Sequence, residues 1–145
     1  MVKKVGRILC ASILAFAMFF ASPVYAEGGN FSIESVDIID KSENVVAGTP
    51  AISGSTITSD TTFHAVNDYV TYKIVLKNNG ELERKIVDIT DDNENSLFDY
   101  EYDNHADEKI KTGENLTLEL KVVYKNANTD DENRDYVSSV RFNIT

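Results

Sequence analysis

The stretch YVTYKIVLKNNG, residues 69–80, decides the fold class because its apolar and polar side chains alternate one by one. Tyr72, Ile74 and Leu76 fall on one face, and lysines and a threonine fall on the other. Successive side chains of a strand point to opposite faces, so this pattern predicts a β-strand with one buried side. Asn79 and Gly80 accept positive φ, which predicts a hairpin turn into a second strand over residues 81–90.

A second alternating stretch, LTLELKVVY over residues 116–124, has the same physical meaning. Leucines occupy positions 116, 118 and 120, and Val122 and Tyr124 continue the stripe. We expect the stripes around Ile74 and Leu118 to be the two inner walls of a layered all-β body.

Weaker strand patterns fill most of the remaining sequence, with polar, turn-rich segments between them. They cover residues 31–40, 51–58, 61–66, 97–102 and 134–144. Seven to eight short strands at this spacing predict an immunoglobulin-like antiparallel β-sandwich. No linker or internal repeat interrupts residues 27–145, so we expect them to form one domain.

The first 26 residues differ from the rest and have the three parts of a secretory signal peptide. Three basic residues precede an apolar run over residues 8–21, and Val24-Tyr25-Ala26 places small or apolar residues where signal peptidase needs them. We therefore predict a signal-peptide helix over residues 1–26, removed after Ala26. The alternative is an uncleaved membrane anchor, which normally needs ~20 apolar residues.

Cys10 is the only cysteine, and it lies at the start of the apolar run, where a lipid-modified cysteine does not occur. It leaves with the signal, so the domain must be stable without a disulfide. Residues 27–145 keep 11 of the 14 basic residues and all 24 acidic ones, a formal charge of 11 minus 24, or −13. This charge argues against nucleic-acid partners and against anionic membranes. We expect a secreted protein that is released or associated with the cell surface, without membrane insertion after cleavage.

The residues also carry a family resemblance. Residues 65–80, AVNDYVTYKIVLKNNG, resemble the "gD.vtYtitvtNnG" signature of conserved-repeat immunoglobulin-like domains of bacterial (Gram-positive type) surface and secreted proteins. Residues 86–91 are similar to the next strand of that family, and residues 110–124, with Gly113 and Glu114 at a turn, to its "i..Get.t..v.y" strand. The resemblance covers about half the chain and implies adhesive, spacing or surface-layer roles. Asn67 stands where the family has glycine, and an acidic loop at 92–97 replaces the family's "LP.gl.f" loop.

The acidic loop is the main candidate for a ligand site, because carboxylate and amide oxygens are calcium ligands. Its members are Asp91, Asp92, Asn93, Glu94 and Asn95, with Asp99 and Glu101 nearby. An EF-hand reading fails because the sixth position from Asp91 is serine and the twelfth is tyrosine. Two interpretations of this loop remain: a calcium site with less regular geometry than an EF-hand, and a solvent-exposed turn that binds no metal. A second acidic group covers residues 130–132.

Nothing in the sequence indicates catalysis. The two histidines, His64 and His105, lie in no nucleophile motif, and fit ordinary strand-end positions. Lys85 is the best candidate for an isopeptide cross-link, against a surface role, while the lysines at 73, 77 and 121 alternate with apolar positions and should face water. Tyrosines at 100, 102, 124 and 136 suit either glycan stacking or core packing.

We therefore assign no catalytic, cofactor-binding or metal-ligating residue and expect no enzyme and no cofactor. The predicted function is a non-catalytic structural, adhesive or protein-interaction module of the bacterial cell envelope, with an unidentified protein or envelope partner. The alternative is a secreted calcium- or small-ligand-binding module that uses the acidic loop 91–101.

Overall fold

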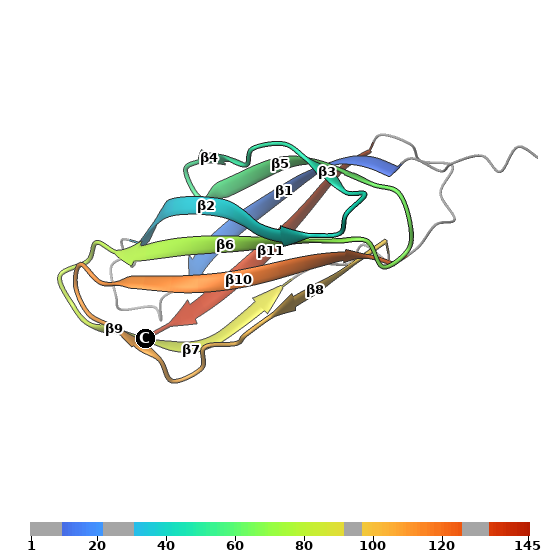
Figure 1. Ribbon diagram of the computed structural model, residues 1–145. Helices are drawn as coiled ribbons and strands as arrows, with labels where there is room; N and C mark the ends of the chain where they lie inside the picture. The colour runs from blue at the N-terminus through green and yellow to red at the C-terminus, as the bar shows by residue number, and fades with distance from the viewer. Residues whose placement is uncertain (1–9, 22–30, 92–96, 126–133) are drawn as a thin grey trace, which may run out of the picture.

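The protein folds as two β-sheets packed face to face around one apolar core (Figure 1). The computed structural model describes residues 10–21, 31–91, 97–125 and 134–145. Within these ranges it contains strands and turns, with no helix. The all-β class expected from the alternating patterns is therefore confirmed.

The first sheet has the strand order β2-β6-β10-β8, and all its pairings are antiparallel. Its strands are β2 (Phe31–Lys41), β6 (Tyr69–Asn78), β10 (Asn115–Tyr124) and β8 (Phe98–Tyr102). Ile74 pairs directly with Leu118, and both side chains are fully buried. The two stripes therefore form one inner wall side by side. The expectation that they face each other across the core was wrong, because periodicity reports the buried face and not the partner strand.

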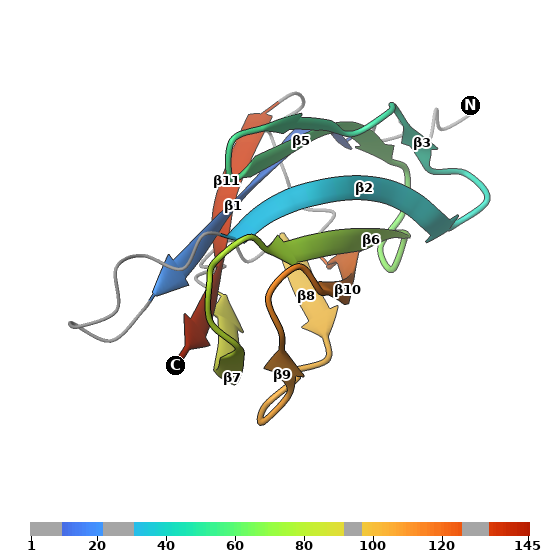
Figure 2. The ribbon, with the colours of Figure 1, turned by 90° about the vertical axis from the view of Figure 1, so that its left-hand side faces the viewer.

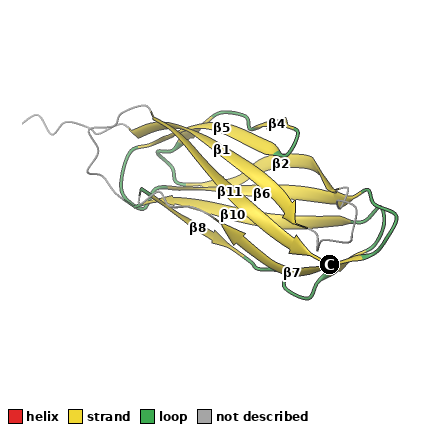
Figure 3. Ribbon diagram, turned by 180° about the vertical axis from the view of Figure 1, so that it is seen from behind, coloured by secondary structure: helices red, strands yellow, loops and turns green. Residues whose placement is uncertain are grey.

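The second sheet forms the opposite wall and has the order β3-β5-β1-β11-β7-β9, with β4 paired to β5. Figure 3 shows β5, β1, β11 and β7 of this sheet from behind. Its strands are β3 (Val46–Ala47), β4 (Ala51–Ser53), β5 (Thr56–Phe63), β1 (Cys10–Ala21), β11 (Arg134–Ile144), β7 (Arg84–Asp91) and β9 (Lys109–Ile110). The expected strands 51–58 and 61–66 correspond to β4 and the longer β5. Side chains from β5, β7 and the end of β11 complete the core: Ile57, Phe63, Ile86, Ile89 and Ile144.

Residues 78–80 form a corner between the sheets. The predicted hairpin is wrong, because β6 lies in the first sheet and β7 pairs with β11 and β9 in the second (Figure 2). The fully buried Asn78 side chain holds this corner: its Nδ2 donates to the carbonyls of Leu82 and Ile110, at 2.9 and 3.0 Å. Its Oδ1 accepts from the Gly80 amide at 2.9 Å. Neither Asn79 nor Gly80 is among the residues with positive φ.

A β-bulge in β7 changes which of its residues face the core. The register with β11 shifts between Asn143 and Ile144, so Ile86 and Ile89, three positions apart, are both buried. Val87 is 49% exposed. A bulge adds one residue to one strand and reverses the alternation beyond it, which explains this spacing.

Two turns contain a residue with a left-handed backbone. Gly113, before β10, has φ of 78°, which suits glycine. Asn67 adopts φ of 71°, the left-handed region that asparagine tolerates better than most residues. The adjacent Asp68 carboxylate accepts the amides of His64 and Ala65 at 2.8 and 2.9 Å, which fixes the turn before β6.

Residues 10–21 of the expected signal helix form strand β1 instead. This strand pairs antiparallel with β5 and parallel with β11. The rest of the predicted signal, residues 1–9 and 22–26, lies outside the described residues. In the described ranges, no helix has the length and apolar character needed to cross a bilayer.

Candidate functional site

The acidic loop begins where β7 ends and runs toward β8. Residues 92–96 and the second acidic group, 130–132, lie outside the described residues. The three described carboxylates engage different partners: Asp91 accepts from the Tyr102 hydroxyl at 2.7 Å, Asp99 contacts Lys125 at 3.5 Å, and Glu101 contacts Lys121 at 3.3 Å. No group of three or more metal-ligand side chains occurs among the residues that the structure describes. The calcium site stays a prediction.

The Tyr102–Asp91 hydrogen bond joins β8, the edge strand of the first sheet, to β7 of the second sheet. Partial burial and this hydrogen bond to a carboxylate raise the pKa of Tyr102 to about 12, since both favour the neutral phenol. The hydroxyl therefore stays protonated, and keeps donating to Asp91, to a higher pH than an ordinary tyrosine would.

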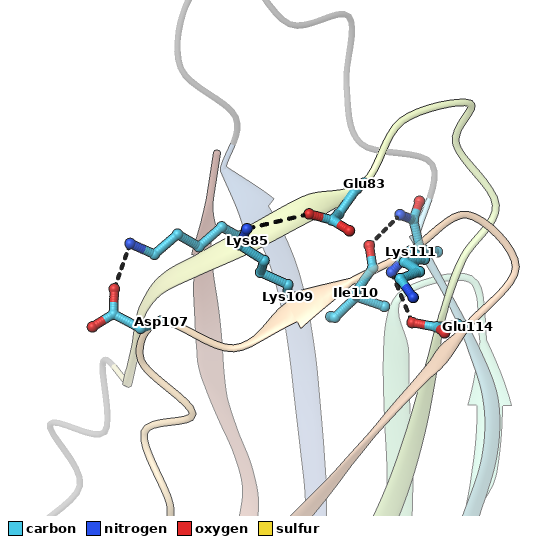
Figure 4. A network of polar contacts seen from close by, with 8 residues as sticks. Glu83, Lys85, Asp107, Lys109, Ile110, Lys111 and Glu114 are labelled. Atoms are coloured by element: carbon cyan, nitrogen blue, oxygen red, sulfur yellow. Dashed lines mark hydrogen bonds and ion pairs between the residues drawn. The ribbon is translucent and has the colours of Figure 1, made fainter.

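The end of the molecule near β9 carries a network of ion pairs (Figure 4). Lys85 pairs with Asp107, and Lys109 lies 3.6 Å from Glu83. The hydrogen bond from Lys85 lowers the pKa of the Asp107 carboxyl. Lys85 is half exposed and paired, which fits the expected surface role better than an isopeptide cross-link.

The loop between β8 and β9 has an unusual backbone for non-glycine residues. His105 and Asp107 have φ of 51° and 69°. The His105 ring is mostly buried, and its Nδ1 lies 2.7 Å from a Glu108 carboxylate oxygen. Local hydrogen bonds hold this conformation: the Glu108 amide donates to the His105 carbonyl at 3.1 Å, and the Asp107 amide to the Ile86 carbonyl at 2.9 Å.

The two histidines lie at opposite ends of the sandwich. His64 precedes β6 beside the turn at Asn67, whose amide donates to the carbonyl of Tyr124 at the end of β10. His105 follows β8 and lies near the start of β7. The fold does not bring them together, so they cannot share a metal ion or a proton-transfer role.

The outer face of the first sheet carries a mixed charge pattern around Lys121. Its ammonium lies 4.7 Å from the centre of the Tyr69 ring and pairs with Glu101. The Tyr69 hydroxyl donates to Asp40 at 2.9 Å, and this bond raises the pKa of Tyr69. Lys73 faces water, and Lys77 is partly exposed on the same face, as the alternation predicts.

The tyrosines proposed for glycan stacking have different surroundings. Tyr124 is buried, and its ring centre lies 5.9 Å from that of Phe63 and 5.7 Å from that of Phe98. Tyr100 and Tyr102 pack partly against the core. The side chain of Tyr136 lies outside the described part of the chain. For these three tyrosines, packing is the role that their surroundings favour.

Sequence reasoning missed a buried hydroxyl cluster that joins the two sheets. Tyr72 of β6 donates to Ser59 of β5 at 2.9 Å, and Thr61 lies 3.2 Å from both oxygens. Burial raises the pKa of the Tyr72 phenol. The signal was present: Ser59 and Thr61 share the parity of Ile57 and Phe63 in β5. These bonds join β5 of the second sheet to β6 of the first through buried side chains.

The last candidate for a functional site is the position of strand β1 within the second sheet. Ten residues of β1 pair with β11 and eight pair with β5, so both backbone edges of β1 are engaged. The segment that the sequence predicts to be removed thus separates the two halves of this sheet.

No protein-family model matches the chain, and no curated protein matches its sequence.

Proposed function

We propose that the protein is a non-catalytic, exported module of the bacterial cell envelope, with an immunoglobulin-like sandwich that serves structure, adhesion or protein contact. The observation that carries the proposal is the two-sheet core, whose largest buried side chains come from β5, β6, β7 and β10 and which needs no cysteine. A domain stabilised by packing alone is independent of the redox conditions outside the cell.

The immunoglobulin-like assignment is supported by the antiparallel order β2-β6-β10-β8 facing a sheet that contains β5, β11 and β7. It is also supported at the motif positions that resemble the conserved-repeat domains. Asn67 and Gly113 both have positive φ, and Asp68 closes the turn before β6.

A role in binding rather than catalysis is supported by how the charged side chains are used. The lysines at 85, 109, 121 and 125 each contact a carboxylate. Exposed pairs of this kind add little to stability, and they leave charged groups at the surface, where charge complementarity with a partner acts.

Export is tested by changing the residues at the predicted cleavage site. Ala26→Lys should block processing and leave the full-length chain with the membrane fraction, because signal peptidase needs a small residue before the cut. Tyr25→Lys is the matched control, with the same charge one position earlier, and should be processed to begin at Glu27. Mass spectrometry of the cell and medium fractions measures both. Full-length wild-type protein in the cytoplasm would refute the proposal.

The proposed contact role is tested on the cell surface. Cross-linking of intact cells that export the wild-type protein should trap it with an envelope protein or with further copies of itself. Recovery of the protein only as an uncross-linked monomer would contradict an adhesive or structural role.

A further inference from the structure

Removal of residues 1–26 would take strand β1 out of the second sheet and leave its position empty. β1 lies between β5 and β11, and neighbouring strands are ~4.8 Å apart, so β5 and β11 are separated by ~10 Å. An N–H···O hydrogen bond spans only about 3 Å between its heavy atoms. Cleavage after Ala26 therefore leaves the facing backbone edges of both strands without partners.

Closure of this gap would require β5 and β11 to move together, and each is fixed elsewhere. β5 is held by its pairing with β4, by the buried bond that Tyr72 of the other sheet donates to Ser59, and by the buried bond between Thr61 and Tyr72. β11 is held by its pairing with β7, by the buried Ile144, and by two bonds between Lys85 and Thr145 of 2.7 and 2.8 Å. A shift of one strand spacing would break one set of these contacts.

We propose that the processed protein takes up an extended strand of another polypeptide in the slot between β5 and β11, antiparallel to β5 and parallel to β11. The proposal rests on the proposed export and processing. Insertion of a strand between open sheet edges is a known mode of recognition, in which main-chain bonds give affinity and alternate side chains give specificity.

The register of β1 defines the chemistry of this partner strand. Positions 14 and 16 lie opposite the buried Ser59 and Ile57, and carry leucine and phenylalanine. Positions 13 and 15 lie opposite Asp60 and Thr58, on the outer face of the sheet. Residues 10–21 contain no charged side chain. The partner segment should thus be at least eight residues long, with large apolar residues at the two positions that pair with Ser59 and Ile57.

A different polypeptide fits better than a second processed copy. In the ranges described, each strand of residues 31–145 already pairs within its own sheets. Only four residues separate the predicted new N-terminus from β2, too few for a donated strand of eight residues.

The test uses exported protein whose N-terminus has first been confirmed as Glu27. It is mixed with a synthetic peptide of residues 11–21 that carries lysines at both ends for solubility. Two altered peptides have equal charge: Leu14→Lys with Phe16→Lys at positions opposite buried residues, and Ile13→Lys with Ala15→Lys at positions opposite outer ones. The readouts are the melting temperature and hydrogen exchange of residues 56–63 and 134–144.

The parent peptide and the outer-position peptide should raise the melting temperature by roughly 5 °C at saturation and slow exchange in both strands. The peptide altered at positions 14 and 16 should do neither. Equal effects of all three peptides would show that they bind only through attraction between their lysines and the acidic protein. Slow exchange in β5 and β11 without any peptide would show that the two strands have closed the gap and pair with each other. Either result overturns the inference while leaving export intact. Self-assembly of the processed protein would overturn the choice of a separate partner, and an N-terminus at Met1 would overturn the proposed function itself.

Discussion

At the scale of single residues, Asn78 shows how one buried side chain fixes the path of the chain between sheets. Its amide satisfies three backbone groups at the corner after β6. Asparagine at a strand end usually suggests a surface turn, and only the structure distinguishes this buried role.

Replacement of Asn78 by alanine should cost about 3 kcal/mol of unfolding free energy, because it leaves buried backbone groups without hydrogen-bond partners. Asn79→Ala is the control: that exposed side chain has one bond, to Ser32, and its loss should cost less than about 0.5 kcal/mol. Chemical denaturation of both variants measures the difference. Equal costs would show that the corner is held by other contacts.

The raised pKa of Tyr102 predicts that the stability of the fold depends on pH in alkaline solution. Its pKa is raised from 10.0 to about 12 in the folded state, so the folded protein holds this proton more tightly than the unfolded chain does. The resulting stability is fully present below pH 10 and is lost as the pH rises through about 12. Denaturation at several pH values across this window should show a shallower decline for Tyr102→Phe than for the wild-type protein. Parallel declines would contradict the shifted pKa.

At the scale of elements, the sequence predicted most strands, but it did not predict which strands pair with one another in each sheet. The regular alternation in β6 and β10 identified most of their buried residues, because these strands pack on one side along most of their length; Val123, near the end of β10, is buried on the other side. The pattern could not assign a sheet to either strand. The turn residues at 78–80 are the same types that would close a hairpin, and two-residue strands such as β3 and β9 are too short to show any period.

Bulges limited the prediction further, because one inserted residue reverses the alternation without a clear sequence signal. In β2, the register shift after Ile33 changes the alternation, so that Val36 and Ile38, and not Ser35 and Asp37, pack against the core beyond it. For the candidate site, the sequence identified the carboxylates of the acidic loop but not their lysine and tyrosine partners, which come from β8, β10 and the residue after β10.

The bulge in β7 gives a direct test of this element. Ile86→Ala should destabilise the protein by about 2–5 kcal/mol, since Ile86 is fully buried. Val87→Ala should cost at most about 1 kcal/mol, because that side chain is half exposed. Urea denaturation of the two variants compares them. A larger loss at Val87 would mean that β7 has the regular alternation and not the bulged register.

At the scale of the whole molecule, the charge of residues 27–145 is the most general property of the chain. A formal charge of −13 attracts cations weakly over the entire surface, and salt screens this attraction within about 8 Å at physiological ionic strength. A specific site, by contrast, would bind calcium with saturation in the same buffer.

We expect calorimetric titration of the exported protein with calcium, in roughly 0.15 M salt, to give no saturable heat and no rise in melting temperature. The described carboxylates near the acidic loop already contact Tyr102, Lys121 and Lys125. Saturable heat that disappears in Asp91→Asn would instead favour the calcium-binding alternative.

The central claim is that residues 27–145 form a sandwich whose stability comes from the paired strands β6 and β10. Hydrogen exchange of the exported protein, followed by mass spectrometry, tests it most directly. We predict that the amides of residues 70–76 and 116–122 exchange most slowly, because these strands lie inside the first sheet and carry the buried stripe. Exchange in both segments at the rate of an unfolded chain would contradict the claim.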